Sequence, residues 1–154
     1  MDTDIYELSA RVHAENCLGP LPKKGVSLVP TAPDSSLGHM CEHFVPGMHN
    51  FFSTETGVHV QEAWAMLANM ASEGLPMFVP GTAFAFADLM EDCPGIVPLP
   101  AGSVVMVTGG FKGRRRKVPA NVLHEQLATQ MPGAQIVSEY GMSELASQLW
   151  AIPA

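Results

Sequence analysis

Charged side chains are scarce in this sequence. Lys, Arg, Asp and Glu make up 15% of its 154 residues, against roughly 25% in an average soluble domain. Bases are the scarcer kind, because 8 Lys and Arg stand against 15 Asp and Glu, a formal net charge of −7. An acidic chain is a poor non-specific binder of nucleic acid, so we expect no such partner. Two interpretations of the low charge remain open: a surface covered by a partner, a second copy or further sequence, or a single domain with long loops rich in Pro and Gly.

Other absences restrict the compartment. The three cysteines, Cys17, Cys41 and Cys93, are widely spaced and form no Cys-x-x-Cys pair, which is typical of a reducing cytosol rather than of a disulfide framework. The first residues, Met1-Asp2-Thr3-Asp4, are acidic where a signal peptide is basic. No apolar run approaches the roughly 18 residues of a membrane span. We therefore expect a cytoplasmic protein with no membrane partner.

Strand-like and helix-like segments alternate along the chain. Strands are expected at 25–29, 76–79, 103–107, 136–137 and 149–152. Helical patterns are expected at 5–17, 34–45, 57–74, 83–90 and 120–131. The clearest helix has Val60, Trp64, Leu67 and Met70 or Ala71 on one face. This alternation predicts an α/β fold with a mainly parallel sheet and flanking helices, in a single domain over residues 1–154.

One cluster of histidines has metal-ligand spacing. The stretch His39-Met40-Cys41-Glu42-His43 matches H-x-x-E-H, the inverted zinc-protease signature. On a helix, His39 and His43 lie on one face, as paired zinc ligands require, but no third ligand on a second helix is identifiable. A zinc-dependent hydrolase using His39, Glu42 and His43 is therefore one alternative function, and a non-catalytic binding or scaffold module is another.

Two glycine-containing stretches invite a phosphate-loop interpretation. Thr108-Gly109-Gly110-Phe111-Lys112-Gly113 follows the strongest strand, and α/β sheets bind ligands at the carboxyl ends of their strands. Five of the eight bases lie within residues 112–117, and Lys112 is the best candidate among them for contact with an anionic ligand. By contrast, Ser53-Thr54-Glu55-Thr56-Gly57 is interpreted as a turn with a cap for the following helix. Neither stretch matches a P-loop or G-x-G-x-x-G.

The most informative stretch is Ser138-Glu139-Tyr140-Gly141-Met142-Ser143-Glu144-Leu145, which follows the apolar Gln135-Ile136-Val137. In a turn that leaves a strand, the ring of Tyr140 can stack on a base and Gly141 lets the backbone approach phosphate. The Glu144 carboxylate can hold Mg²⁺. The stretch therefore predicts a nucleotide site.

The double-glycine turn and Tyr140-Gly141-Met142-Ser143-Glu144 together resemble the adenylate-forming enzymes, a superfamily of acyl-CoA synthetases, luciferases and adenylation domains. The chain is most similar to the acyl-protein synthetase family of bacterial bioluminescence, which is related to phenylacetate-CoA ligases. Further matching stretches lie in the family's order: Ser27-Leu28-Val29-Pro30, Asp34-Ser35-Ser36-Leu37-Gly38-His39-Met40, Pro80-Gly81-Thr82-Ala83-Phe84 and the residues up to Gln148.

The resemblance implies ATP- and Mg²⁺-dependent activation of a fatty or other hydrophobic carboxylic acid as an acyl-adenylate. A protein or CoA thiol then takes the acyl group. Gly109 and Gly110 would lie against the adenine or the adenylate, and Tyr140 would stack on adenine. Ser143, which stands where the superfamily usually has Thr, would bond a phosphate oxygen, and Glu144 would hold Mg²⁺.

The resemblance also implies a substrate site. Ser36 and His39 would lie near the acyl pocket. Besides the carboxylic acid, the implied partners are a chain that completes the site or acyl-carrying enzyme subunits.

Parts of the family's pattern are absent. The phosphate loop should precede Ser27-Leu28-Val29-Pro30, and residues 1–25 contain nothing like it. A ribose-binding Asp, the acceptor Cys and a small C-terminal lid domain with its catalytic Lys should follow Glu144, but the sequence ends at Ala154 on a pattern typical of a core strand. We therefore expect a partial N-terminal domain, from a truncated or split enzyme that is inactive alone.

Overall fold

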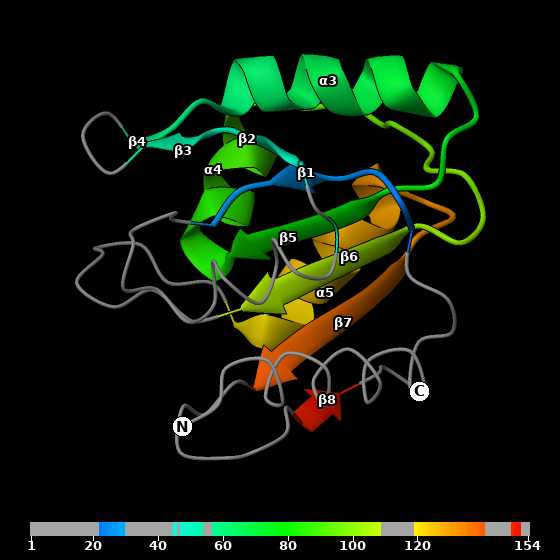
Figure 1. Cartoon of the computed structure of the whole chain (residues 1–154). Helices are drawn as coiled ribbons and strands as arrows, with labels where there is room; N and C mark the ends of the chain where they lie inside the picture. The colour runs from blue at the N-terminus through cyan, green and yellow to red at the C-terminus, as the bar shows by residue number, and fades with distance from the viewer. Residues whose placement is uncertain are drawn as a thin grey trace, which may run out of the picture.

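A parallel sheet forms the centre of the molecule. The computed structural model describes residues 22–29, 45, 47–53, 57–108, 119–140 and 149–151. Its main sheet has the order β5-β6-β7-β8 (Figure 1). These strands are β5 (Phe78–Thr82), β6 (Val104–Thr108), β7 (Gln135–Tyr140) and β8 (Leu149–Ala151). The first three are parallel, and β8 runs antiparallel to β7. The predicted α/β fold with a mainly parallel sheet is confirmed.

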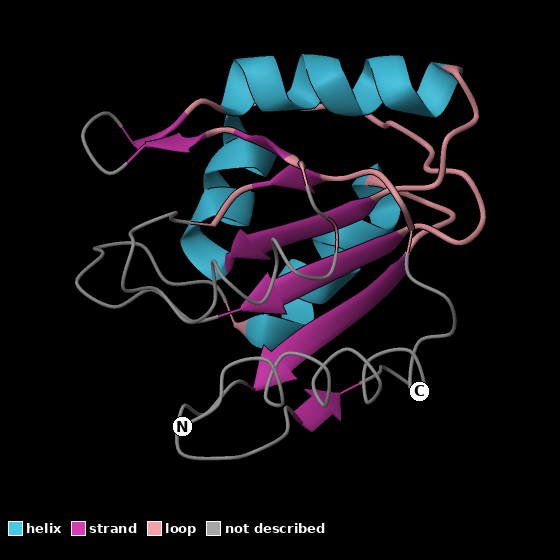
Figure 2. Cartoon of the chain, viewed as in Figure 1, coloured by secondary structure: helices cyan, strands magenta, loops and turns pink. Residues whose placement is uncertain are grey.

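Three helices pack on this sheet and on one another. They are α3 (Val60–Ser72), α4 (Ala83–Asp92) and α5 (Ala120–Gln130). Helices α4 and α5 connect successive parallel strands and lie behind the sheet in the view of Figure 2, while α3 packs against α4. The buried core includes these side chains from the three helices and the sheet: Leu67, Met70, Phe86, Leu89, Val105, Leu123, Leu127 and Ile136.

Short strands extend the sheet beyond β5. Strand β1 (Val26–Ser27) is parallel to β2 (His49–Asn50), and β3 (Phe52–Ser53) is antiparallel to β4 (Gly57–Val58). Parallel bridges at Gly25–Phe78 and Leu28–Gly81 join β1 to β5. Pro80 lies between these bridges and has no amide hydrogen to donate, so the ladder between β1 and β5 is interrupted there.

The helix predicted within 57–74 is present, but its start differs from the prediction. The helix buries Val60, Leu67 and Met70 as expected, and Trp64 is half-buried against the core. The interpretation of 53–57 as its cap is wrong. His59 is the N-cap and makes no side-chain cap hydrogen bond, while Ser53 and Gly57 belong to β3 and β4.

The remaining differences concern boundaries and short elements. The predicted strand at 76–79 ends before Pro80, whereas β5 continues through Pro80 and Gly81 to Thr82. Strand β7 extends beyond the predicted 136–137 to Tyr140. Strands β2, β3 and β4 were not predicted, because two residues are too few to show a period of two. The helix predicted at 5–17 lies outside the described residues, as does that at 34–45 except for Val45, which is buried and not helical. No helix in the described part of the chain is long and apolar enough to cross a membrane.

Candidate functional site

The carboxyl ends of the parallel strands meet at one edge of the sheet. Thr82, the last residue of β5, pairs with Thr108, the last residue of β6, and Thr108 pairs with Glu139 of β7. The bridge between Leu28 and Gly81 brings the end of β1 to the same edge. We call this the carboxyl edge. Ligands of open α/β sheets bind outside such an edge.

Both predicted nucleotide-binding stretches begin at the carboxyl edge, on neighbouring strands. Gly109 directly follows Thr108, and Gly141 directly follows Tyr140, which is the last residue of β7 rather than part of the turn. Tyr140 also pairs with Leu149 of β8. The connection through residues 141–148 therefore begins and ends on one cross-strand pair.

Most of the predicted site residues lie outside the described residues, so their contacts stay predictions. For Tyr140 the structure describes the backbone alone. The residues outside the described ranges are Ser36, His39, Gly109, Gly110, Lys112, Gly141, Ser143 and Glu144. The zinc alternative also rests on residues outside those ranges. Within the described part of the chain, no group of three or more His, Cys, Asp or Glu side chains is arranged to hold a metal.

Thr82 links the carboxyl edge to helix α4. Its hydroxyl accepts a hydrogen bond from the backbone amide of Ala85 at 3.3 Å, so it is the N-cap of α4. Gly81 precedes it, and a Cβ at that position would lie 2.7 Å from the ring of Phe86. The glycine thus lets the helix pack closely on the end of β5. Thr108 ends the next strand and is also buried.

A side-chain hydrogen bond joins helix α5 to strand β7 close to the same edge. Nε2 of His124 lies 2.7 Å from Oγ of Ser138. Burial lowers the pKa of His124 below its ordinary value. The pair was not predicted, because nothing in the sequence connects Ser138, the first residue of the 138–145 stretch, with His124.

Asn50 fixes the end of β1. Its Nδ2 donates to the backbone oxygen of Val29 at 3.1 Å, and its Oδ1 accepts from the amide of Phe52 at 2.7 Å. The amide of Val29 itself donates to the hydroxyl of Ser27 at 3.3 Å. These bonds hold the backbone at the end of β1.

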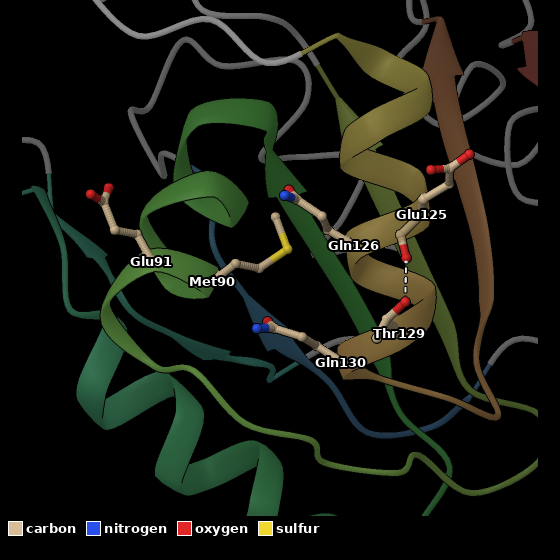
Figure 3. A pocket seen from close by; sticks show the side chains of 6 residues that line it. All are labelled: Met90, Glu91, Glu125, Gln126, Thr129 and Gln130. Atoms are coloured by element: carbon tan, nitrogen blue, oxygen red, sulfur yellow. Dashed lines mark hydrogen bonds between the residues drawn. The ribbon is translucent and has the colours of Figure 1, made fainter.

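A separate polar groove lies between α4 and α5, toward the ends of both helices (Figure 3). Its volume is about 430 Å³. Oε1 of Gln130 is buried there and has no hydrogen-bond partner in the described part of the chain. The lining residues are Met90, Glu91, Glu125, Gln126, Thr129 and Gln130, none of which belongs to the predicted site.

Solved structures share this fold. The unliganded O-succinylbenzoate coenzyme A synthetase (MenE) of Bacillus subtilis matches with a TM-score of 0.57 and 18% identity, over 97% of this chain and 30% of that one. A double mutant of the same enzyme, bound to the product analogue OSB-NCoA, gives a TM-score of 0.60 and 16% identity over 96% and 28%. VinN gives 0.52 and 15% over 90% and 31%. The chain has the fold of part of a coenzyme A synthetase.

The comparisons define how far the resemblance extends. Coenzyme A synthetases are among the adenylate-forming enzymes that the sequence motifs resemble, so the superfamily's fold is supported and the bioluminescence branch is not. No protein-family model matches the sequence, and a search of curated proteins finds no match. The chain spans about 30% of the length of the synthetase.

Proposed function

We propose that this chain supplies the adenylate-binding edge of an adenylate-forming ligase. The reaction would join a fatty or other hydrophobic carboxylic acid to AMP at the expense of ATP, with Mg²⁺, and pass the acyl group to a protein or CoA thiol. The observation that carries the proposal is the pairing of Thr108 with Glu139, which makes the two predicted nucleotide-binding stretches neighbours. The fold shared with a coenzyme A synthetase supports the same reaction class.

The direction of the helices supports an anionic ligand at the carboxyl edge. Helix α4 begins directly after Thr82, and α5 runs back toward the start of β7, so both helix N-termini lie toward this edge. Neither helix has an acidic residue in its first turn, whereas α3 has Glu62 there. Helix N-termini carry partial positive charge, so the edge favours the phosphates of a nucleotide.

Each proposed residue has a defined chemical task. A carboxylate oxygen of the acid attacks the α-phosphorus of ATP, the bond to pyrophosphate breaks, and an acyl-adenylate forms. Glu144 would hold Mg²⁺, and the hydroxyl of Ser143 would donate to a phosphate oxygen, so both offset charge that grows in the transition state. Tyr140 would stack on the adenine, and Gly109 and Gly110 would let the backbone approach it closely. Lys112 would attract the phosphates.

Binding of a stable adenylate analogue tests the proposal. An acyl-adenosine with a sulfamoyl group in place of the phosphate should bind the purified chain in calorimetry and bind much more weakly to Tyr140→Ala. ATP should bind more tightly with Mg²⁺ than without it. Glu144→Gln should reduce the gain in ATP affinity that Mg²⁺ provides by roughly 10- to 100-fold, the loss typical of a weakened metal site.

Glu125→Gln is the matched control, because Glu125 is an exposed carboxylate of α5 outside the proposed site. It should leave both affinities unchanged. If the wild-type chain binds neither the analogue nor ATP, the ligase proposal is wrong and a non-catalytic module becomes the better account.

A further inference from the structure

Ile96 is the one large apolar side chain that is exposed among the described residues, at 63%. The half-buried ring of Trp64 lies beside the preceding residue, since a Cβ at Gly95 would lie 3.9 Å from Cζ2 of that ring. On the other side of Ile96, the amide of Val97 donates to the backbone oxygen of Gln130 at 2.8 Å. The loop that carries Ile96 therefore connects the surface of α3 with the end of α5.

The polar groove between α4 and α5 adjoins this loop, because Gln130 contacts the loop and also lines the groove. In Figure 3 the side chains of Gln126 and Gln130 point from α5 toward Met90 of α4. Met90 is half-buried and packs against the core. We call Trp64, Met90, Ile96, Gln126 and Gln130 together the Ile96 surface.

The elements around the Ile96 surface carry acidic side chains and no basic ones. Residues 57–108 and 119–140, which include all three helices, contain no Lys or Arg. Glu91 and Glu125 line the groove, and both are exposed. The carboxyl-terminal ends of α4 and α5 also lie here, and no basic residue in either last turn offsets their partial negative charge. The surface is therefore apolar at its centre and negative around it.

We propose that the Ile96 surface binds an apolar segment of a partner protein that carries Lys or Arg beside its apolar residues. Protein interfaces are enriched in Trp and Met and depleted of charge at their centres. Negative charge around the centre favours a basic partner, and disfavours a second copy of this acidic chain.

The groove supports the same partner chemistry. Oε1 of Gln130 is buried and has no hydrogen-bond partner among the described residues, and an unpaired buried acceptor costs free energy. An ammonium or guanidinium group in the groove would supply the missing donor. Helices α4 and α5 begin toward the carboxyl edge and end at the Ile96 surface, so the proposal does not depend on the ligase function.

A short helical peptide of leucine and lysine is the probe for this surface. Two matched peptides carry glutamate in place of lysine, or serine in place of leucine. The leucine–lysine peptide should bind the purified chain in calorimetry, and each of the other two should bind at least roughly tenfold more weakly. Hydrogen exchange should show protection in peptides covering 90–99 and 124–131, with no change at 104–108.

Variants separate the apolar centre from the charged surroundings. Ile96→Ser should weaken binding of the leucine–lysine peptide by roughly tenfold, the loss of a central anchor, whereas Ile96→Leu should retain it. Gln130→Leu should weaken binding by roughly three- to tenfold without lowering stability, because its Oε1 makes no hydrogen bond that could be lost. Glu125→Gln should weaken binding by roughly two- to fivefold. The matched control is Glu73→Gln, at the far end of α3, which should leave the affinity unchanged.

Each outcome decides for or against the proposal. Equal affinity of wild type and Ile96→Ser, or of the lysine and glutamate peptides, overturns it, as does a folded chain that binds none of the three peptides. Equal affinity of the serine-containing peptide would show that the groove takes an amine alone, which also overturns it. Analytical ultracentrifugation should find the free chain monomeric, and a dimer that Ile96→Ser dissociates would assign the surface to a second copy instead.

Discussion

The edge of the sheet where the parallel strands begin and the carboxyl edge differ in the groups that lie there. At the edge where the strands begin, backbone groups bond one another: the amide of Val97 donates to Gln130 and that of Leu99 to Pro132, each at 2.8 Å. The hydroxyl of Ser103 accepts from the amide of Met77 at 3.1 Å. At the carboxyl edge, β5 and β6 end in the buried threonines Thr82 and Thr108. Main-chain hydrogen bonds hold the edge where the strands begin, whereas the carboxyl edge is where we propose that the adenylate binds, so substitutions at the two edges should have separable effects.

The largest effect is expected at the edge where the strands begin. Gly133 has a φ of +97°, and a Cβ there would clash with the backbone oxygen of Leu99. Gly133→Ala should therefore lower the free energy of unfolding by about 3 kcal/mol. Urea unfolding followed by circular dichroism measures this change.

Gly74→Ala is the matched control for that prediction. Gly74 has a φ of +74° but no atom within 4 Å of the position of a Cβ. Gly74→Ala should therefore lower the free energy of unfolding only through backbone strain, by about 1 kcal/mol. Equal losses in the two variants would show that the contact with Leu99 contributes nothing to the free energy of unfolding.

A smaller effect is expected from the cap at the carboxyl edge. Thr82→Ala removes the acceptor for the amide of Ala85 and should destabilise the protein by about 1 kcal/mol, while Thr82→Ser should be close to wild type. The same unfolding measurement applies. If Thr82→Ala were neutral in stability but weakened nucleotide binding, the hydroxyl would belong to the ligand site and not to the helix.

The sequence was informative where patterns are long. The apolar spacing of Val60, Trp64, Leu67 and Met70 or Ala71 predicted the helix α3, and the alternation of strands with helices predicted the parallel sheet. Strand β5 was ended too early, because Pro80 and Gly81 usually mark turns. Here Pro80 lies at a gap in the pairing with β1, a tertiary circumstance that no local pattern shows.

The candidate site was predictable only as motifs on strand ends. The two motifs are neighbours because β6 pairs with β7. The order of the elements in the sequence indicated this pairing, and the structure gives its register. The bond from His124 to Ser138 was beyond prediction, because it depends on how α5 packs on β7, and no sequence pattern connects the two residues.

The smallest effect concerns pH. Because burial lowers the pKa of His124, an unfolded chain takes up a proton near pH 6.5 that the folded chain still lacks. Stability should therefore fall as the pH drops below about 6.5 toward the folded pKa. Comparing urea midpoints at about pH 7.5 and pH 5.5, His124→Gln should lose less stability than wild type. An equal loss in both proteins would assign the pH dependence to other groups.

The central claim is that the carboxyl edge binds the adenylate. Hydrogen exchange of the wild-type chain with and without the acyl-sulfamoyl-adenosine tests it most directly. We predict protection in peptides covering 108–113 and 139–148, with no change at 97–103 or 130–135. Protection confined to the groove around Gln126 and Gln130, or to the edge where the strands begin, would contradict it.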